Sequence, residues 1–209
     1  MTTPTPQTAA AAFVPCGVIE LRQYTLHPGC RDELITLFER EFTHTQEALG
    51  LHVLGIFRDA DNANRFVWLR GFADMATRRR ALEAFYDGPV WQQHRSAANA
   101  TMIDSDDVLL LRPLAGSVAA MAAGTWHVMA WPLAGPLQEA QRAAIAQQPG
   151  AWFESETAPN NFSRLPVRAG HWLMALSPQT AALPAALERA FCGTPIRLRL
   201  QPTHRSPLQ

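Results

Sequence analysis

The sequence predicts an α+β fold in which one chain carries two βαββαβ halves. Strand-like and helical patterns follow one another in that order along the first half, and the order returns in the second half. A stretch of small residues at 115–124 separates the halves and is typical of a linker. The chain has 209 residues, which is enough for two small units that each bury apolar side chains.

The first half opens with VIELRQYTL, whose alternation is typical of a strand with one apolar face. A His-Pro-Gly turn leads to a helix with apolar residues three and four apart, and Gly50 ends it. Two strand-like runs joined by the turn DNAN form a hairpin, and Asp74 is a suitable N-cap for the next helix. The expected elements are strand Val18–Leu26, helix Arg31–Leu49, strands Leu51–Asp59 and Arg65–Phe72, helix Met75–Tyr86 and strand Val108–Arg112. This is the order of a ferredoxin-like unit.

The second half contains segments that match the first. TWHVMAWPLAG corresponds to IELRQYTLHPG, which places Trp131 where the first half has Tyr24. HWLMALS corresponds to VWLRGFA, and AALERAFCGTP echoes the second helix RALEAFYDGP. The expected elements are strand Thr125–Gly135, a shortened helix Leu137–Gln147, strand His171–Ser177, a helix within Ala185–Pro195 and strand Ile196–Pro202.

Each predicted sheet has helices on one face only, so its other face needs a cover. We expect the two bare faces to pack together within the chain as a barrel. The expected bounds are a disordered arm at 1–16, a first unit at 17–114, a linker at 115–124 and a second unit at 125–203. One set of first-half side chains is then expected to point between the sheets: Glu20, Arg22, Tyr24, Phe66, Trp68 and Arg70.

The composition excludes several classes of function. The 18 acidic and 18 basic residues cancel, which removes the positive field that nonspecific nucleic-acid binding needs. All basic residues are Arg, so no lysine is available for a Schiff base or a P-loop. Three cysteines without a CxxC pair, no signal-like start and no apolar run of about 20 residues indicate a cytoplasmic protein without a membrane span.

The candidate site residues come from two places. The segment 90–107 has no counterpart in the second half, and it contributes Trp91, His94, Arg95 and Asn99. The first strand and the hairpin contribute Glu20, Arg22, Tyr24, Trp68 and Arg70, as ligand contacts or, for the charged residues, as partners of one another.

His94 and Tyr24 are the candidate catalytic groups, as proton acceptors. A surface histidine and a core aromatic are the commoner roles for such residues. The triple Arg at 78–80 suits a solvated helix face, or contact with a partner or an anion. The acidic residues at 104–107 suit a solvated loop, and no HxxxH or HExxH spacing occurs, so no metal site is predicted.

Two stretches, ELRQYTLHPG and FYDGPVWQQHRSAANATMIDSDDVLLLRP, resemble the NIPSNAP family over roughly residues 18–114. The resemblance implies the dimeric α/β-barrel superfamily, here formed within one chain. Its members include cofactor-free monooxygenases, haem-using enzymes and proteins with no established activity. Haem ligation by His94 is one alternative that this implies, but a lone histidine is a weak signal and no cofactor is predicted. No catalytic set transfers residue by residue.

Three hypotheses follow, for a protein that is a monomer or a homodimer. The first is a protein that binds a small hydrophobic or aromatic molecule between its sheets, oriented by Arg22, Tyr24 or Arg70. The second is a cofactor-independent oxygenase or isomerase acting on an aromatic or quinone-like substrate, with His94 or Tyr24 as proton acceptor. The third is a protein-interaction module.

Overall fold

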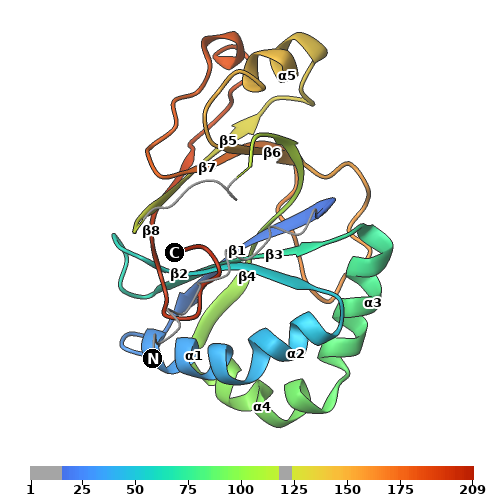
Figure 1. Cartoon of the computed structure of the whole chain (residues 1–209), viewed down its shortest axis with the longest axis vertical. Helices are drawn as coiled ribbons and strands as arrows, with labels where there is room; N and C mark the ends of the chain where they lie inside the picture. The colour runs from blue at the N-terminus through green and yellow to red at the C-terminus, as the bar shows by residue number, and fades with distance from the viewer. Residues whose placement is uncertain (1–15, 118–123) are drawn as a thin grey trace, which may run out of the picture.

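Eight antiparallel strands close into a barrel in the order β1-β3-β2-β8-β5-β7-β6-β4 in the computed structural model, which describes residues 16–117 and 124–209 (Figure 1). The strands are β1 (Val18–Leu26), β2 (His52–Asp59), β3 (Arg65–Phe72), β4 (Met102–Ala115), β5 (Trp126–Leu133), β6 (Ala151–Ser155), β7 (His171–Ser177) and β8 (Ile196–Pro202). The halves contribute β4-β1-β3-β2 and β8-β5-β7-β6, the same order in each, and they join at β2–β8 and β4–β6. This confirms the predicted intrachain barrel of two ferredoxin-like halves. The predicted arm, apart from buried Cys16, and most of the predicted linker lie outside the described residues.

The larger helical layer belongs to the first half (Figure 1). Its members are α1 (Arg31–Leu37), the π-helical turn η1 (Phe38–Phe42), α2 (Thr43–Ala48), α3 (Met75–Tyr86) and α4 (Pro89–Ala100). The Asp74 side chain accepts a hydrogen bond from the Thr77 amide, as an N-cap does. Helix α4 and the early start of β4 account for the segment that the second half lacks.

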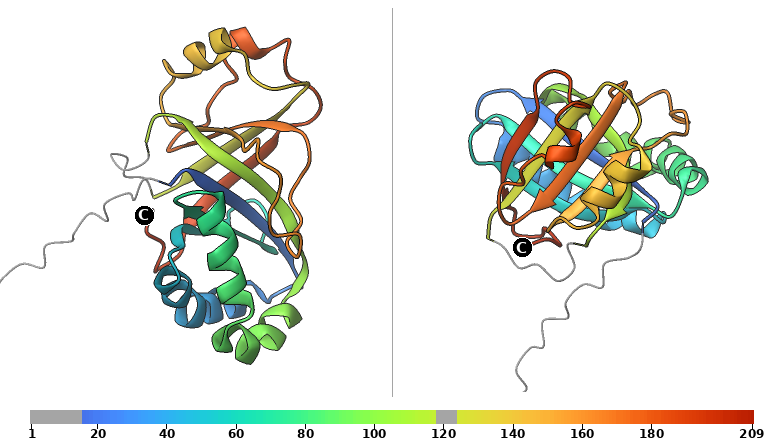
Figure 2. Two further views of the ribbon diagram at one scale, coloured as in Figure 1. Left: turned by 90° about the vertical axis from the view of Figure 1, so that its right-hand side faces the viewer. Right: turned by 90° about the horizontal axis from the view of Figure 1, so that it is seen from above.

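The second half has a thinner cover, seen above the barrel in both views of its long axis (Figures 1 and 2). It consists of α5 (Glu139–Ile145), the 3₁₀ turn η2 (Ala185–Leu187) and loops. The helix predicted within 185–195 does not form beyond that turn. Instead Phe191 forms a β-bridge with Leu133, and the Cys192 amide donates to the Pro132 carbonyl. Backbone groups that would bond to one another within a helix thus bond to the end of strand β5.

The barrel interior is filled by apolar side chains from both halves. Ile19 and Leu21 of β1 pack there with Val67, Trp126 and Leu200. The opposite face of the first-half sheet is also buried, because the helices cover it and form a second apolar cluster with it. This cluster includes three side chains that were predicted to point into the barrel: Tyr24, Phe66 and Trp68.

The predicted facing of the first-half sheet is therefore wrong. Glu20, Arg22 and Arg70 alternate with barrel residues along their strands. Arg70 donates to Gln46 of α2, and Glu20 accepts from Arg78 of α3. Alternation separates two faces of a strand but does not say which one the helices cover when both are buried.

The second-half sheet does not repeat the polar residues of the first. Trp68 lies opposite Arg22 in the β1–β3 ladder, and the matching place in the β5–β7 ladder holds Ala175 opposite Met129. The match of HWLMALS to VWLRGFA is thus three residues out of register. An odd shift reverses the face, and Trp172 indeed packs against the barrel cluster.

Candidate functional site

A buried cluster of one carboxylate and three guanidinium groups lies on the helix-covered face of the first-half sheet. Glu20 Oε2 is 2.9 Å from Arg22 Nη1 and 2.7 Å from Arg70 Nη2, and Glu20 Oε1 is 2.6 Å from Arg78 Nε. The side chains come from β1, β3 and α3, and none is more than 1% exposed. Such a cluster is held apart from water, so its interactions are stronger than those of surface pairs.

The cluster carries a surplus of positive charge. Burial works to raise the pKa of Glu20, but attraction by Arg70, Arg22 and Arg78 outweighs it and holds that pKa well below its ordinary range. Glu20 is therefore ionised at neutral pH. Three guanidinium groups against this one carboxylate leave a formal charge of +2.

Arg22 connects this cluster to a pocket. Its Nε donates to the Tyr24 hydroxyl at 3.2 Å, its Nη1 to Glu20 at 2.9 Å, and its Nη2 to the Ser105 carbonyl at 3.2 Å. All three nitrogens of Arg22 are thus held by protein oxygens. Arg22, Tyr24 and Ser105 all line the pocket, while Glu20 does not.

The pocket lies between the first-half sheet and its helices and has a volume of about 90 Å³. Its walls are largely aromatic, formed by Phe38, Phe42, Trp68, Phe85, Tyr86 and Trp91. The π-helical turn η1 supplies two of these rings, and turns of this kind are frequent at functional sites. Polar Gln46, Asn99 and Ser105 also line the pocket, and exposed Asn99 marks the side that opens to solvent.

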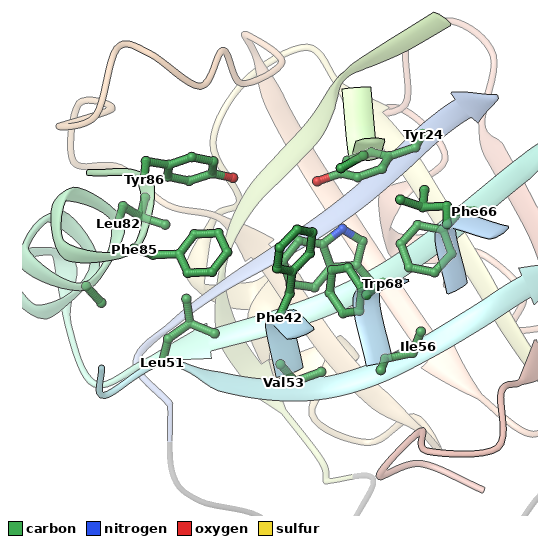
Figure 3. Close-up of a cluster of buried hydrophobic side chains, with 14 of the residues drawn as sticks. Tyr24, Phe42, Leu51, Val53, Ile56, Phe66, Trp68, Leu82, Phe85 and Tyr86 are labelled. Atoms are coloured by element: carbon green, nitrogen blue, oxygen red, sulfur yellow. The ribbon is translucent and has the colours of Figure 1, made fainter. Parts of the chain in front are cut away.

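Polar atoms of three aromatic residues converge on this space. Figure 3 shows the hydroxyl groups of Tyr24 and Tyr86 pointing toward one another, with the indole nitrogen of Trp68 turned toward the same region. Trp68 is 1% exposed and its Nε1 has no hydrogen-bond partner. Burial raises the pKa of Tyr86, although Arg70 acts in the opposite direction, so Tyr86 stays protonated at neutral pH.

A loop of the second half, 156–170, closes part of the pocket. It runs beside α3 (Figure 1), where Phe162 stacks on Tyr86 with ring centroids 5.8 Å apart. Leu165 lines the pocket, and Asn160 and Asn161 accept hydrogen bonds from Arg78 at 3.0 and 2.9 Å. The second half therefore supplies a wall of the pocket and supports the buried cluster.

The structure brings most of the residues named from the sequence together. Five of them line the pocket: Arg22, Tyr24, Trp68, Trp91 and Asn99. Glu20 and Arg70 lie behind the pocket in the charged cluster.

The other two lie apart from it. His94 does not line the pocket, and its Nε2 is 3.5 Å from Oε2 of Glu41. Arg95 is exposed on α4.

Sequence reasoning missed Arg78 and Tyr86 and gave no site role to Gln46. The arginine run at 78–80 predicts a solvated helix face, or contact with a partner or an anion, yet Arg78 is fully buried. Helical spacing was the available signal, because Arg78 precedes Leu82 by four residues and Tyr86 by eight, which puts all three on one face.

A second depression lies over the second-half sheet, with a volume of about 560 Å³. Met129, Trp131, Phe191 and Arg197 are among its lining residues, and it is more open than the first-half pocket. Within 16–117 and 124–209, no group of His, Cys, Asp and Glu side chains is arranged to hold a metal ion. None of the helices in these described ranges has the length and apolar character needed to cross a bilayer.

Comparison with known proteins agrees with this architecture. The NIPSNAP family model matches residues 19–118. A candidate monooxygenase of Fusobacterium nucleatum aligns over 90% of this chain and 93% of its own, with 10% identity and a TM-score of 0.59. A candidate monooxygenase of Lactobacillus acidophilus aligns over 88% and 93%, with 12% identity and a TM-score of 0.54.

At these identities the two whole-length matches show the fold alone. A NIPSNAP-like domain protein of Burkholderia xenovorans is 26% identical over 44% of this chain and 81% of its own, with a TM-score of 0.41. No functionally curated protein is similar in sequence to this chain. The match to the NIPSNAP family model thus lies in the first half of the chain, which shares one polypeptide with a second ferredoxin-like half that completes the barrel.

Proposed function

We propose that this protein binds a small aromatic or otherwise hydrophobic molecule in the pocket between the first-half sheet and its helices. The observation that carries the proposal is the composition of this pocket, in which aromatic walls surround a few convergent polar groups. Ligand sites in proteins commonly combine apolar walls with a small number of polar groups that fix orientation. The proposed site differs from the space between the sheets, because apolar side chains of both halves pack there.

The size of the pocket limits the ligand. An apolar cavity of about 150 Å³ takes up benzene, and this pocket has about 90 Å³ and an opening to solvent. The pocket is smaller than that cavity, so it suits no more than a single ring or a similar planar group, with further substituents emerging beside Asn99 and Met102.

A second candidate function is a cofactor-independent oxygenase or isomerase acting on an aromatic or quinone-like substrate. The position of the Tyr24 hydroxyl favours it, because Arg22 holds this group at 3.2 Å on the pocket wall, within reach of a bound substrate. The whole-length structural neighbours include two candidate monooxygenases, a likeness of fold that raises this alternative without assigning chemistry. His94 is the weaker proton acceptor of the two on position, since it lies outside the pocket lining.

The binding proposal is tested with nitrobenzene, a neutral single-ring compound that quenches tryptophan fluorescence. Ala98 is buried and lines the pocket, whereas its neighbour Ala97 is exposed on the same helix. We expect saturable quenching, with affinity reduced at least tenfold in Ala98→Leu and unchanged in Ala97→Leu.

If Ala98→Leu is folded, as judged by its melting curve, and binds nitrobenzene with unaltered affinity, the proposed location of the binding site is refuted. If that variant does not fold, Met102→Trp at the half-buried edge of the pocket provides the same test.

A further inference from the structure

Resting on the proposed binding function, we propose that the pocket selects a ligand by a single anionic oxygen, so that a phenol or enol binds as its phenolate or enolate. The inference combines the excess positive charge behind the pocket with hydrogen-bond donors that have no acceptor inside it. Neither feature is needed to bind a neutral hydrophobic molecule.

The charge argument starts from the buried cluster. Glu20 neutralises only one of three guanidinium groups, and all four side chains are shielded from water. No carboxylate is among the described residues that line the pocket. Away from solvent, the remaining positive charge favours a negative charge placed beside Arg22 over a neutral group.

The donor argument concerns the atoms that face the cavity. The Tyr24 oxygen already accepts a hydrogen bond from Arg22 Nε, so its own proton is free to be donated to a ligand. The Trp68 Nε1–H, which can only donate, is buried without an acceptor. The Tyr86 hydroxyl points at Tyr24 from the other side (Figure 3). One ligand oxygen in this space would accept from the Trp68 Nε1–H, which otherwise remains unsatisfied, and from the tyrosine hydroxyls beside it.

The same geometry favours one oxygen over a carboxylate. Planar carboxylates are best bound by the two parallel N–H groups of an arginine fork. Here every nitrogen of Arg22 already donates to a protein oxygen, namely Tyr24, Glu20 or Ser105. The groups directed at the cavity are single O–H and N–H donors from separate side chains, which suit an oxyanion of one atom.

Other charged groups lie near the pocket but do not face it. Asp104 and Asp106 flank Ser105 and are exposed, and Glu41 is engaged with Arg40 and His94. The groups facing a bound oxygen are Arg22 and Tyr24 from β1, Trp68 from β3 and Tyr86 from α3, with Gln46 of α2 as a neutral neighbour.

The experiment uses 4-nitrophenol, whose phenolate has its own visible absorption band, with nitrobenzene as the neutral analogue. Titration of bound and free 4-nitrophenol over pH gives the preference for the anion, since one unit of pKa corresponds to a tenfold preference. We expect the pKa of bound 4-nitrophenol to fall by at least one unit, and the phenolate to bind at least tenfold more tightly than nitrobenzene. Benzoate is expected to bind more weakly than the phenolate.

Trp68→Phe keeps the ring and removes the unsatisfied donor. It should lower the phenolate affinity on the order of tenfold while leaving nitrobenzene binding unchanged. Trp91→Phe, which changes another wall of the same pocket, is the matched control and should alter both affinities equally.

Equal affinities for 4-nitrophenol and nitrobenzene, with no shift of the bound pKa, would overturn the inference and leave the binding proposal standing. Benzoate that binds as tightly as the phenolate would overturn the choice of a single oxygen. If none of the compounds binds, the proposed function falls and the inference falls with it.

Discussion

Replacing Glu20 with Gln should destabilise the protein more than any replacement of a surface carboxylate. Glu20→Gln keeps the shape of the side chain but removes the one negative charge that three buried guanidinium groups share. Arg22, Arg70 and Arg78 would then repel one another without compensation. Breaking a single buried ion pair by removing one partner costs about 3–5 kcal/mol.

This magnitude translates into a measurable change. For a protein of this size, 1 kcal/mol shifts the melting temperature by roughly 2–4 °C, so the variant should melt about 6–20 °C lower at pH 7. The difference should depend on pH. Because the native pKa of Glu20 lies below its ordinary value of 4.5, the unfolded chain takes up the proton first, and the stabilisation is lost as pH falls below that value.

Thermal unfolding followed by circular dichroism from pH 3 to pH 8 is the appropriate assay. Glu83→Gln is the matched control, because Glu83 also pairs with an arginine, Arg79, but both side chains are largely exposed. The account predicts a large gap between wild type and Glu20→Gln at pH 7 that narrows in acid, and no comparable gap for Glu83→Gln. A Glu20→Gln variant that melts within 1–2 °C of wild type at pH 7, roughly the effect of 0.5 kcal/mol, would refute the reasoning.

Two further outcomes follow from particular residues. Burial raises the pKa of the Cys16 thiol to about 11, so iodoacetamide at pH 8 should modify exposed Cys192 and spare Cys16 in the native protein. Mass spectrometry measures the labelling, and equal labelling rates at both cysteines would contradict this prediction. Phe162→Ala removes a buried ring that stacks on Tyr86, so it should lower the free energy of unfolding by about 3–5 kcal/mol and weaken nitrobenzene binding as well. Urea unfolding with the linear extrapolation measures the first effect, and an unchanged midpoint would show that this ring does not stabilise the fold. Unchanged nitrobenzene affinity would show that the second-half loop does not support the pocket.

Much of the fold was predictable because the local patterns were unambiguous. Strands β1, β3, β7 and β8 and helix α3 begin and end where periodicity, turn residues and the Asp74 cap predicted. The helix predicted within 185–195 does not form, because backbone groups of this segment hydrogen-bond to the end of β5 instead. Helix propensity is a local property and does not predict such a tertiary hydrogen-bonding alternative.

The location of the candidate site was less predictable. The polar residues of β1 and β3 stood out as a group, but both faces of their sheet are buried, so alternation could not say whether they faced the barrel or the helices. Arg78 shows the complementary error. A run of three arginines is typical of an exposed helix face. Only the spacing of Arg78 from Leu82 and Tyr86, which places all three on one side of the helix, indicates that Arg78 is buried.

The central claim is that a small aromatic ligand binds between the first-half sheet and its helices. A crystal structure with 4-iodophenol tests it most directly, because anomalous scattering from iodine locates the ring without bias. The account predicts one strong iodine peak among Phe42, Trp91 and Asn99, with the phenol oxygen directed at Tyr24 and Trp68. A sole peak inside the barrel, or over the second-half sheet beside Trp131, would contradict it.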